Sequence, residues 1–220
     1  MSTVKPILIS LDGNIGGGKS TMLQHMRTNF PQWNFIDEPV DSWMSLKNEN
    51  GDNLLSLFYA DKKRWSYTLQ NCAFITRHKK VKDSITAWRK RCETDPSQLA
   101  NNVFITERSV ATDRYVFAEM LRDAGDLNPL EWSLYLEWYN VFADLFPIDA
   151  IVEVTTAYDV CKDRIKIRGR QGEENIPTSY LEDLEKQHRK WLDNTSLPVL
   201  KICSEPSELV KVQSFIDNLQ

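Results

Sequence analysis

The sequence contains no long apolar run, and only 4 of its 220 residues are cysteine and only 3 are histidine. No apolar stretch approaches the roughly 20 residues of a transmembrane helix, so we expect no membrane partner. The cysteines lie far apart and none has C-x-x-C spacing: Cys72, Cys92, Cys161 and Cys203. That spacing argues against a zinc site or a dense disulfide framework, and we expect reduced, buried thiols. Only six residues precede the first apolar strand candidate, which leaves no room for a targeting peptide and favours a cytoplasmic location.

The chain also lacks an excess of basic charge. Its 27 Lys+Arg against 31 Asp+Glu give a net charge of -4, so the overall field does not favour a nucleic acid partner. A hydrophobic content of 41% and a charged content of 26% are ordinary for a globular protein. Residues 1–220 fit one domain that is large enough for a sheet covered on both faces.

Residues 13–20, GNIGGGKS, match the phosphate loop pattern G-x-x-x-x-G-K-[ST]. An apolar run at 7–11 precedes the loop and a helix start at 21–26 follows it, which is the context that the pattern requires. In such a loop backbone N–H groups converge on phosphate oxygens, the lysine reaches the terminal phosphates, and the hydroxyl serves Mg²⁺. The sequence therefore predicts a nucleoside triphosphate site, formed by Gly13, Asn14, Ile15, Gly16, Gly17, Gly18, Lys19, Ser20 and Thr21. A plain glycine-rich turn is the alternative, and it leaves the lysine and the hydroxyl unexplained.

Charged residues follow two of the other strand candidates. The strand at 33–37 ends at Glu38, and the strand at 103–106 ends at Glu107 and Arg108. Ligands of open α/β sheets gather at the carboxyl ends of strands, so Glu38 is a candidate general base and Glu107 a candidate Mg²⁺ ligand. Further strands are predicted at 150–154 and 198–202. For Glu38, a solvated carboxylate before a turn remains the alternative.

Helical periodicity runs from 53 to 91 and predicts two helices with a break near Asp61, followed by a loop at 93–102. On the second helix Gln70, Ala73 and Arg77 share one face and could read a base, although a solvated face would show the same residues. A helix at 128–146 carries Trp132, Tyr135, Trp138, Tyr139 and Phe142. These aromatic residues favour burial in the core and against a second subunit, with core packing alone an equal alternative.

Arginines are grouped at the end of the helix predicted at 157–167 and just after it. Arg164 and Arg168 are four residues apart, and Arg170 follows Gly169. Arginines of this kind can spread the charge that develops during phosphoryl transfer, so we predict an arginine-rich lid at about 164–176. An exposed basic helix end is the alternative, and the phosphate loop disfavours it.

Together these motifs resemble the deoxynucleoside kinase family, the deoxycytidine, deoxyguanosine and mitochondrial thymidine kinase group. The residues that carry the resemblance are Gly13-Asn14-Ile15 with Gly18-Lys19-Ser20, Glu38-Pro39-Val40 with Trp43, Tyr59 with Arg64-Trp65-Ser66, Gln70, Glu107-Arg108-Ser109 with Asp113-Arg114-Tyr115, and Arg168-Gly169-Arg170 with Ile176-Pro177. The resemblance implies an α/β P-loop kinase fold, a five-stranded parallel sheet flanked by helices on both faces, ATP and Mg²⁺ as cofactors, and a homodimer.

The resemblance also implies roles for individual residues. Glu38 would accept the proton of the 5′-hydroxyl, Tyr59 and Glu173 would hold the 3′-hydroxyl, and Gln70 would read the base. Arg108 would position the hydroxyl and the phosphate, with Phe117 stacked on the acceptor base. Ser20 and Glu107 would serve Mg²⁺, and Lys19, Arg168 and Arg170 the transferred phosphoryl group, while Arg164 would lie along the adenine.

Three positions bear on the choice of acceptor. Members of the family that take deoxycytidine or purine deoxynucleosides are similar to this chain in having a small residue, an arginine and an aspartate at Ala73, Arg77 and Asp113. We therefore expect deoxyadenosine, deoxyguanosine or deoxycytidine to be preferred over thymidine. A nucleoside monophosphate kinase is an alternative, but Glu38 would repel an acceptor phosphate. A GTPase-like switch is a more distant alternative, because the chain has neither an N-K-x-D nor a D-x-x-G motif.

Overall fold

The computed structural model describes residues 4–173 and 176–219. Within these ranges a five-stranded, wholly parallel sheet forms the centre, in the order β2-β3-β1-β4-β5. Its strands are β1 (Ile7–Asp12), β2 (Asn34–Ile36), β3 (Val103–Glu107), β4 (Ala150–Val154) and β5 (Val199–Ile202). The predicted five-stranded parallel sheet is confirmed, and each strand lies within two residues of its expected bounds.

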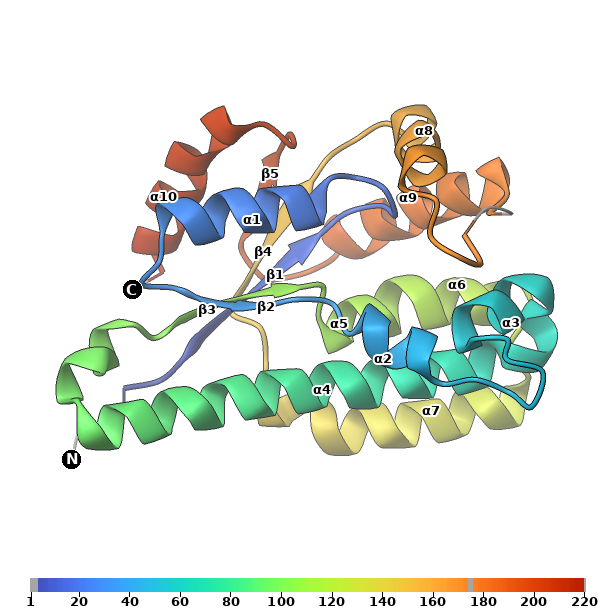
Figure 1. The fold of residues 1–220 in the computed structure, drawn as a ribbon, viewed down its shortest axis with the longest axis horizontal. Helices are drawn as coiled ribbons and strands as arrows, with labels where there is room; N and C mark the ends of the chain where they lie inside the picture. Colours follow the sequence, from blue (N-terminus) through green and yellow to red (C-terminus); the bar gives the residue numbers. More distant parts are fainter. Residues whose placement is uncertain (1–3, 174–175, 220) are drawn as a thin grey trace.

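Helices cover both faces of the sheet (Figure 1). They are α1 (Lys19–Asn29), α2 (Val40–Ser45), α3 (Leu54–Ala60), α4 (Lys62–Thr94), α5 (Val110–Thr112), α6 (Glu119–Asp123), α7 (Pro129–Phe142), α8 (Tyr158–Arg168), α9 (Thr178–Leu192) and α10 (Leu209–Asp217). Short 3₁₀ segments lie at Pro96–Ala100, Ala143–Leu145 and Pro206–Glu208, and a π-helical segment at Asp113–Ala118 joins α5 to α6. The α/β fold class is thus confirmed, and among the described helices none is long and apolar enough to cross a bilayer.

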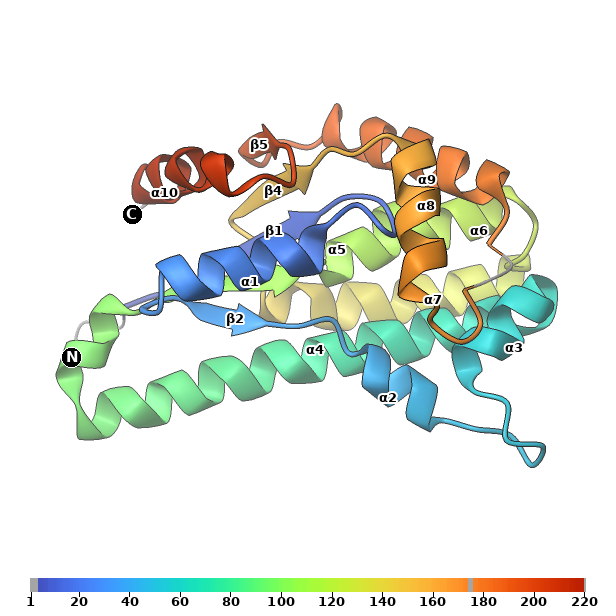
Figure 2. The ribbon, with the colours of Figure 1, turned by 45° about the horizontal axis from the view of Figure 1, so that its top comes forward.

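Each face of the sheet is sealed by apolar side chains. Helices α1 and α10 pack on one face, where Met22 and Val212 lie with Ile9 of β1 in one buried cluster. Helix α4 lies along the other face, where Trp88 is T-stacked on Phe104 of β3. The two ribbon views show α7 running beside α4 (Figure 1 and Figure 2). The sheet is therefore buried on both faces, and the carboxyl edge of its strands is where a site is expected.

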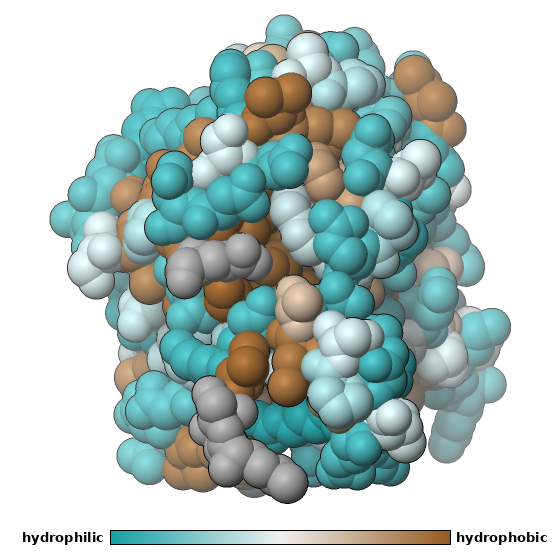
Figure 3. Space-filling model, turned by 90° about the vertical axis from the view of Figure 1, so that its left-hand side faces the viewer, coloured by the Kyte–Doolittle hydropathy of each residue, from teal (hydrophilic) through white to brown (hydrophobic). Residues whose placement is uncertain are grey.

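The break at Asp61 is confirmed, and one residue accounts for it. Asp61 ends α3 and begins α4, where its side chain accepts a hydrogen bond from the Arg64 backbone N–H at 3.1 Å. A carboxylate at this position satisfies an N–H group that has no partner within the helix. Helix α4 then runs for 33 residues without interruption. Its far end lies in the largely hydrophilic face shown in Figure 3, and the basic residues of that end are exposed.

Some expectations need correction. The loop predicted at 93–102 is wrong, because α4 continues to Thr94 and a 3₁₀ turn follows it. Asp95 caps this turn, and the Trp88 indole N–H donates to the Gln98 carbonyl within it at 2.9 Å. The expected burial of all thiols is also wrong: the cysteines are free, but only Cys161 is buried and Cys203 is exposed.

The aromatic helix α7 is not explained by core packing alone, which was one of its two interpretations. Of its aromatic residues only Tyr135 is fully buried, and Trp138 is 44% exposed. Exposed apolar residues lie along the same helix, among them Leu130 at 83% and Val141 at 62%. Core packing alone therefore does not account for this helix.

Candidate active site

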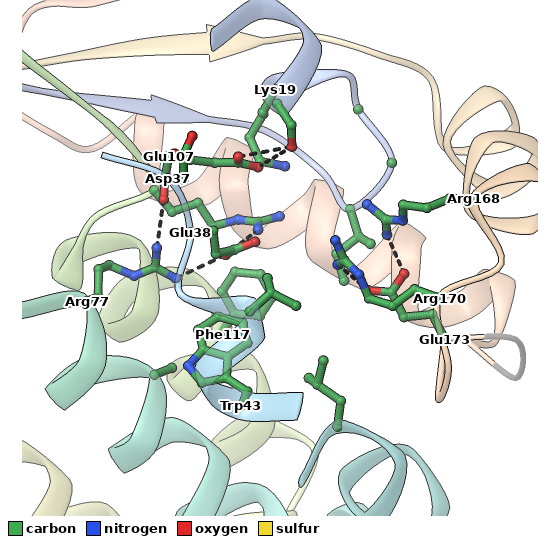
Figure 4. Close-up of a pocket in the computed structure, with 18 of the residues that line it drawn as sticks. Lys19, Asp37, Glu38, Trp43, Arg77, Glu107, Phe117, Arg168, Arg170 and Glu173 are labelled. Atoms are coloured by element: carbon green, nitrogen blue, oxygen red, sulfur yellow. Dashed lines mark hydrogen bonds and ion pairs between the residues drawn. The ribbon is translucent and has the colours of Figure 1, made fainter. Parts of the chain in front are cut away.

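A cavity of about 620 Å³ opens at the carboxyl edge of the sheet (Figure 4). It is lined by 21 of the residues expected from the sequence: Ile15, Gly16, Gly17, Gly18, Lys19, Ser20, Thr21, Glu38, Trp43, Tyr59, Gln70, Ala73, Arg77, Glu107, Arg108, Asp113, Phe117, Arg164, Arg168, Arg170 and Glu173. Gly13 and Asn14 do not line it. Their side of the loop faces a smaller cavity beside Glu153 and His188. The strand-end acids, the face of α4 that carries Gln70, Ala73 and Arg77, and the arginines in and just after α8 therefore meet in one place.

The phosphate loop is folded tightly at the start of α1. A Cβ at Gly16 would lie 2.5 Å from the Cys161 carbonyl oxygen, so only glycine fits there. The Lys19 ammonium is buried and donates to the backbone carbonyls of Gly13 at 3.1 Å and Asn14 at 2.7 Å. Burial, and then the charge of Arg108, lower the pKa of Lys19 to about 8. An anionic ligand would favour the protonated form of this lysine.

Two oxygen donors that suit a divalent cation lie beside the lysine. The Ser20 hydroxyl donates to both carboxylate oxygens of Glu107, at 3.1 and 3.0 Å. Hydroxyl and carboxylate oxygens are ligands that Mg²⁺ prefers, and Ser20 lies in the first turn of α1 next to the lysine. The chemistry of this donor pair therefore fits the Mg²⁺ ion expected from the sequence.

Glu38 lies between two guanidinium groups. One of its oxygens accepts from Arg108 Nη1 at 2.7 Å and from Arg77 Nη2 at 3.1 Å, and its side chain is 12% exposed. Burial alone would raise the pKa of this carboxyl, but the charges of Arg108, Arg77 and Lys19 outweigh it and hold the pKa well below its usual range. The interpretation of Glu38 as a solvated carboxylate is therefore wrong, and the group is an ionised acceptor inside the cavity.

The face of α4 that carries Gln70, Ala73 and Arg77 points into the cavity rather than toward solvent. Arg77 is 2% exposed; its Nε donates to Asp113 at 2.9 Å and its Nη1 to the Glu107 carbonyl at 2.7 Å. Gln70 is 3% exposed, and within the described part of the chain its Oε1 has no hydrogen-bond partner. A buried polar atom of this kind is normally satisfied, so this oxygen indicates a ligand that donates a hydrogen bond. The solvated interpretation of this helix face is wrong.

Two arginines at the end of α8 and just beyond it meet one carboxylate. Arg168 and Arg170 both pair with Glu173, the latter at 2.9 Å, as Figure 4 shows. Arg164 Nη1 lies 3.3 Å from the hydroxyl of Ser204, which follows β5. Of the lid predicted at 164–176, residues 174 and 175 lie outside the described residues. Arg164, Arg168 and Arg170 of this segment line the same cavity as Lys19 and add positive charge to it.

Aromatic side chains line the part of the cavity that lies beside Arg108 and α4. The Arg108 guanidinium lies 5.0 Å from the centre of the Phe117 ring, and the rings of Tyr59 and Tyr180 meet edge to face at 6.2 Å. The Trp43 indole N–H is held by Thr76 on α4 at 2.9 Å. Flat apolar walls with a few polar groups suit a planar base joined to a polar sugar.

The sequence reasoning missed several lining residues: Asp37, Val40, Asp41, Leu55, Phe58, Leu69, Tyr180 and Ser204. Ser204 follows the fifth strand, so the same strand-end rule could have identified it. Tyr180 gave no such signal, because it lies early in α9 and only the packing of this helix brings it to the cavity.

The sequence profile that describes deoxynucleoside kinases matches residues 9–219. The chain belongs to the deoxynucleoside kinase family. It is 33% identical over 207 residues to deoxycytidine kinase 2 of Gallus gallus, covering 87% of this chain and 76% of that protein. It is 34% identical to the mitochondrial deoxyguanosine kinase of Xenopus laevis, with 87% and 75% covered, and 32% identical to deoxycytidine kinase of Homo sapiens, with 86% and 76% covered. This deoxynucleoside kinase is thus an enzyme that phosphorylates a nucleoside from a nucleotide donor.

Proposed function

We propose that this kinase transfers the γ-phosphoryl group of ATP to the 5′-hydroxyl of a deoxynucleoside in nucleotide salvage. We further propose that it takes deoxyadenosine, deoxyguanosine or deoxycytidine in preference to thymidine. The single observation that carries the preference is the buried Arg77–Asp113 pair beside Gln70 in the cavity. The names of the relatives, which refer to deoxycytidine and deoxyguanosine, agree with it.

The preference follows from the hydrogen-bonding groups on this wall. Arg77 supplies donors, Asp113 supplies acceptors, and the Gln70 amide supplies both. The exocyclic amino groups of cytosine, adenine and guanine, together with their ring nitrogen and carbonyl acceptors where present, can pair with such a set. The thymine methyl group would lie against charged groups and leave them unmatched, which is unfavourable for buried polar atoms. Ala73, which is 5% exposed, leaves room for the base between Gln70 and Arg77.

At the reacting centre Glu38 would accept the proton of the 5′-hydroxyl. Its ionised form is favoured by Arg108 and Arg77, and the ionised form is the one that can take up the proton as a base. Arg108 Nη1, which lies 2.7 Å from Glu38, would turn toward the attacking oxygen and the phosphate. Most of the rate acceleration in this kind of reaction comes from positioning and from charge stabilisation.

The donor half would consist of the phosphate loop and the arginines in and just after α8. Lys19 would hold the terminal phosphates, Arg168 and Arg170 would clamp the transferred group, and Arg164 would lie along the adenine. Ser20 and Glu107 would hold Mg²⁺, which neutralises phosphate charge when bound. Closure of the segment 164–176 over the donor would exclude water and limit ATP hydrolysis. In this proposal residues 1–220 form one domain.

One assay tests the activity and its alternatives. ATP is supplied with each of the four deoxynucleosides and, separately, with their monophosphates, and product formation is followed by a coupled ADP assay. We expect the highest kcat/KM for deoxycytidine or a purine deoxynucleoside and no turnover of monophosphates. Thymidine as the best substrate would refute the preference, turnover of monophosphates alone would favour a monophosphate kinase, and slow ATP hydrolysis without any acceptor would favour a switch.

We also propose a homodimer that forms through α7. Its exposed apolar residues recur at spacings of three and four, at Leu130, Leu134, Trp138 and Val141, and so form one stripe. A contiguous row of exposed apolar side chains on a helix is typical of a protein interface. Sedimentation should give a dimer for the wild type and a monomer for Trp138→Glu, whereas a monomeric wild type at micromolar concentration would refute the dimer.

A cytosolic location is the last part of the proposal. The four cysteines are free in the described structure, as expected in a reducing compartment. One matched relative is named as mitochondrial, so the compartment needs a direct test. A tagged full-length chain should fractionate with cytosolic markers, and co-fractionation with mitochondria would refute this location.

A further inference from the structure

Arg108 has an unusual backbone conformation. Among the described residues other than glycine, it alone has a positive φ, of 59°, which is the left-handed region. Residues with a Cβ disfavour this region, so they adopt it where neighbouring groups hold them there. Arg108 comes directly after the last residue of β3, in the middle of the candidate active site.

Hydrogen bonds hold the backbone on both sides of Arg108. Its N–H donates to the Leu11 carbonyl at 3.0 Å, which extends the pairing of β3 with β1 by one residue. Its carbonyl oxygen accepts from the hydroxyl of Thr106 at 2.8 Å. Thr106 is 1% exposed, so no bulk water could replace this bond if the hydroxyl were removed. The Thr106 hydroxyl is thus the side-chain group that fixes the turn at the end of β3.

The neighbouring residues on the other side of the turn are equally fixed. Ser109 caps α5 through reciprocal bonds with Thr112, and the Thr112 hydroxyl donates to the fully buried carboxylate of Asp12 at 2.7 Å. Arg108 therefore lies between a strand end and a helix start that have little freedom to move. Within this frame, the direction of its side chain depends on the left-handed turn that Thr106 stabilises.

The side chain of Arg108 makes its contacts from this conformation. Nη1 lies 2.7 Å from Glu38 Oε1, and Nη2 lies 3.2 Å from the Gly13 carbonyl in the phosphate loop. The guanidinium thereby joins the acceptor side of the cavity to the donor side. A change in its backbone would shift these contacts by a distance that matters for catalysis, because reacting groups must be held within a fraction of an ångström.

We infer that Thr106 is a positioning residue for phosphoryl transfer: its buried hydroxyl holds Arg108 in the left-handed conformation that directs the guanidinium to Glu38 and to the phosphate loop. The inference rests on the proposed roles of Arg108 and Glu38. Thr106 itself does not line the cavity, so it acts through Arg108 alone.

Two substitutions and a control test the inference. Thr106→Val keeps the shape and the strand preference of the side chain but removes the hydroxyl, and Thr106→Ser keeps the hydroxyl. Val103→Ala, at the other end of β3, is the control for loss of stability alone. We expect Thr106→Val to lower kcat about tenfold, the factor that corresponds to one lost hydrogen bond, with the KM of the nucleoside nearly unchanged. Thr106→Ser should restore kcat, and Val103→Ala should lower the melting temperature without lowering kcat.

A double-mutant cycle separates this inference from the proposed function. In an Arg108→Ala background, Thr106→Val should have no further effect on kcat, because the group that it positions is gone. An equal loss in both backgrounds, a wild-type kcat for Thr106→Val, or a loss that serine does not restore would each overturn the positioning role. A wild-type kcat for Arg108→Ala would instead overturn the proposed role of Arg108.

Discussion

Replacing Glu38 with glutamine is the most direct test of the reacting centre. The substitution keeps the size of the side chain and one oxygen acceptor but removes its charge and most of its basicity. In the wild type this oxygen accepts charge-assisted hydrogen bonds from Arg108 at 2.7 Å and Arg77 at 3.1 Å. Both partners are at most 4% exposed, so the variant leaves buried guanidinium groups with a neutral acceptor.

Both the turnover and the stability of the variant should fall. A positioned base contributes a factor of about 10² to 10⁴, so kcat of Glu38→Gln should fall by at least about a hundredfold. Loss of charge from two buried hydrogen bonds should lower the free energy of unfolding by about 3 kcal/mol, and the melting temperature by roughly 6 to 12 °C. Nucleoside affinity should change little, because the base and the 3′-hydroxyl are held elsewhere in the proposed complex.

The assay combines steady-state kinetics, calorimetric titration with the nucleoside and thermal melting. Glu49→Gln, an exposed glutamate outside the cavity, is the control for the chemical change and should behave as the wild type. Unchanged turnover of Glu38→Gln would remove this residue from the role of base. A loss of kcat/KM that is matched by an equal loss of nucleoside affinity would instead make it a binding residue.

Further outcomes are expected at Asp113, Lys19 and Arg170. Asp113→Ala leaves Arg77 buried with fewer partners and should lower the free energy of unfolding by about 3 kcal/mol. The double variant with Asp113→Ala and Arg77→Leu should be less destabilised than the single variant. Chemical denaturation of both variants tests this, and equal losses of stability would contradict the pairing. Nucleotide affinity should fall as pH rises above about 8, because Lys19 then loses its proton, and a flat titration between pH 7 and 9 would contradict it. In the same range the ligand-free enzyme should become more stable, since the folded pKa of Lys19 lies below its unfolded value and the unfolded chain binds more protons. Arg170→Gln should lower kcat at saturating ATP about a hundredfold or more while nucleoside binding persists, and wild-type turnover would exclude the clamp role.

The elements that sequence reasoning predicted well are those with local signals. The phosphate loop has a fixed spacing, and strands that are buried on both faces read as continuous apolar runs, as β3 and β4 do. The strand-end rule then selected Glu38 and Glu107, because the carboxyl edge of a parallel sheet is shared by its strands. These predictions needed no knowledge of how distant segments pack.

The remaining features depend on tertiary contacts. Spacing along α4 put Gln70 and Arg77 on one face, but whether that face met water or a cavity was decided by the packing of α4 against β2, α5 and the π-helical segment that follows α5. Tyr180 reaches the cavity only through the placement of α9. The left-handed turn at Arg108 has no sequence signature, since arginine is not a residue that favours this region.

Helix α4 extends over 33 residues, roughly 50 Å at 1.5 Å per residue, and it carries Gln70, Ala73 and Arg77 on successive turns. The spacing of these three side chains is therefore set by helix geometry and not by the conformation of a loop. In the proposed complex, the groups that select the base can be exchanged one at a time on a scaffold that stays the same. Related chains can thus diverge in the nucleoside that they accept through single substitutions on this helix, while the phosphate loop and the strand-end acids keep the chemistry unchanged.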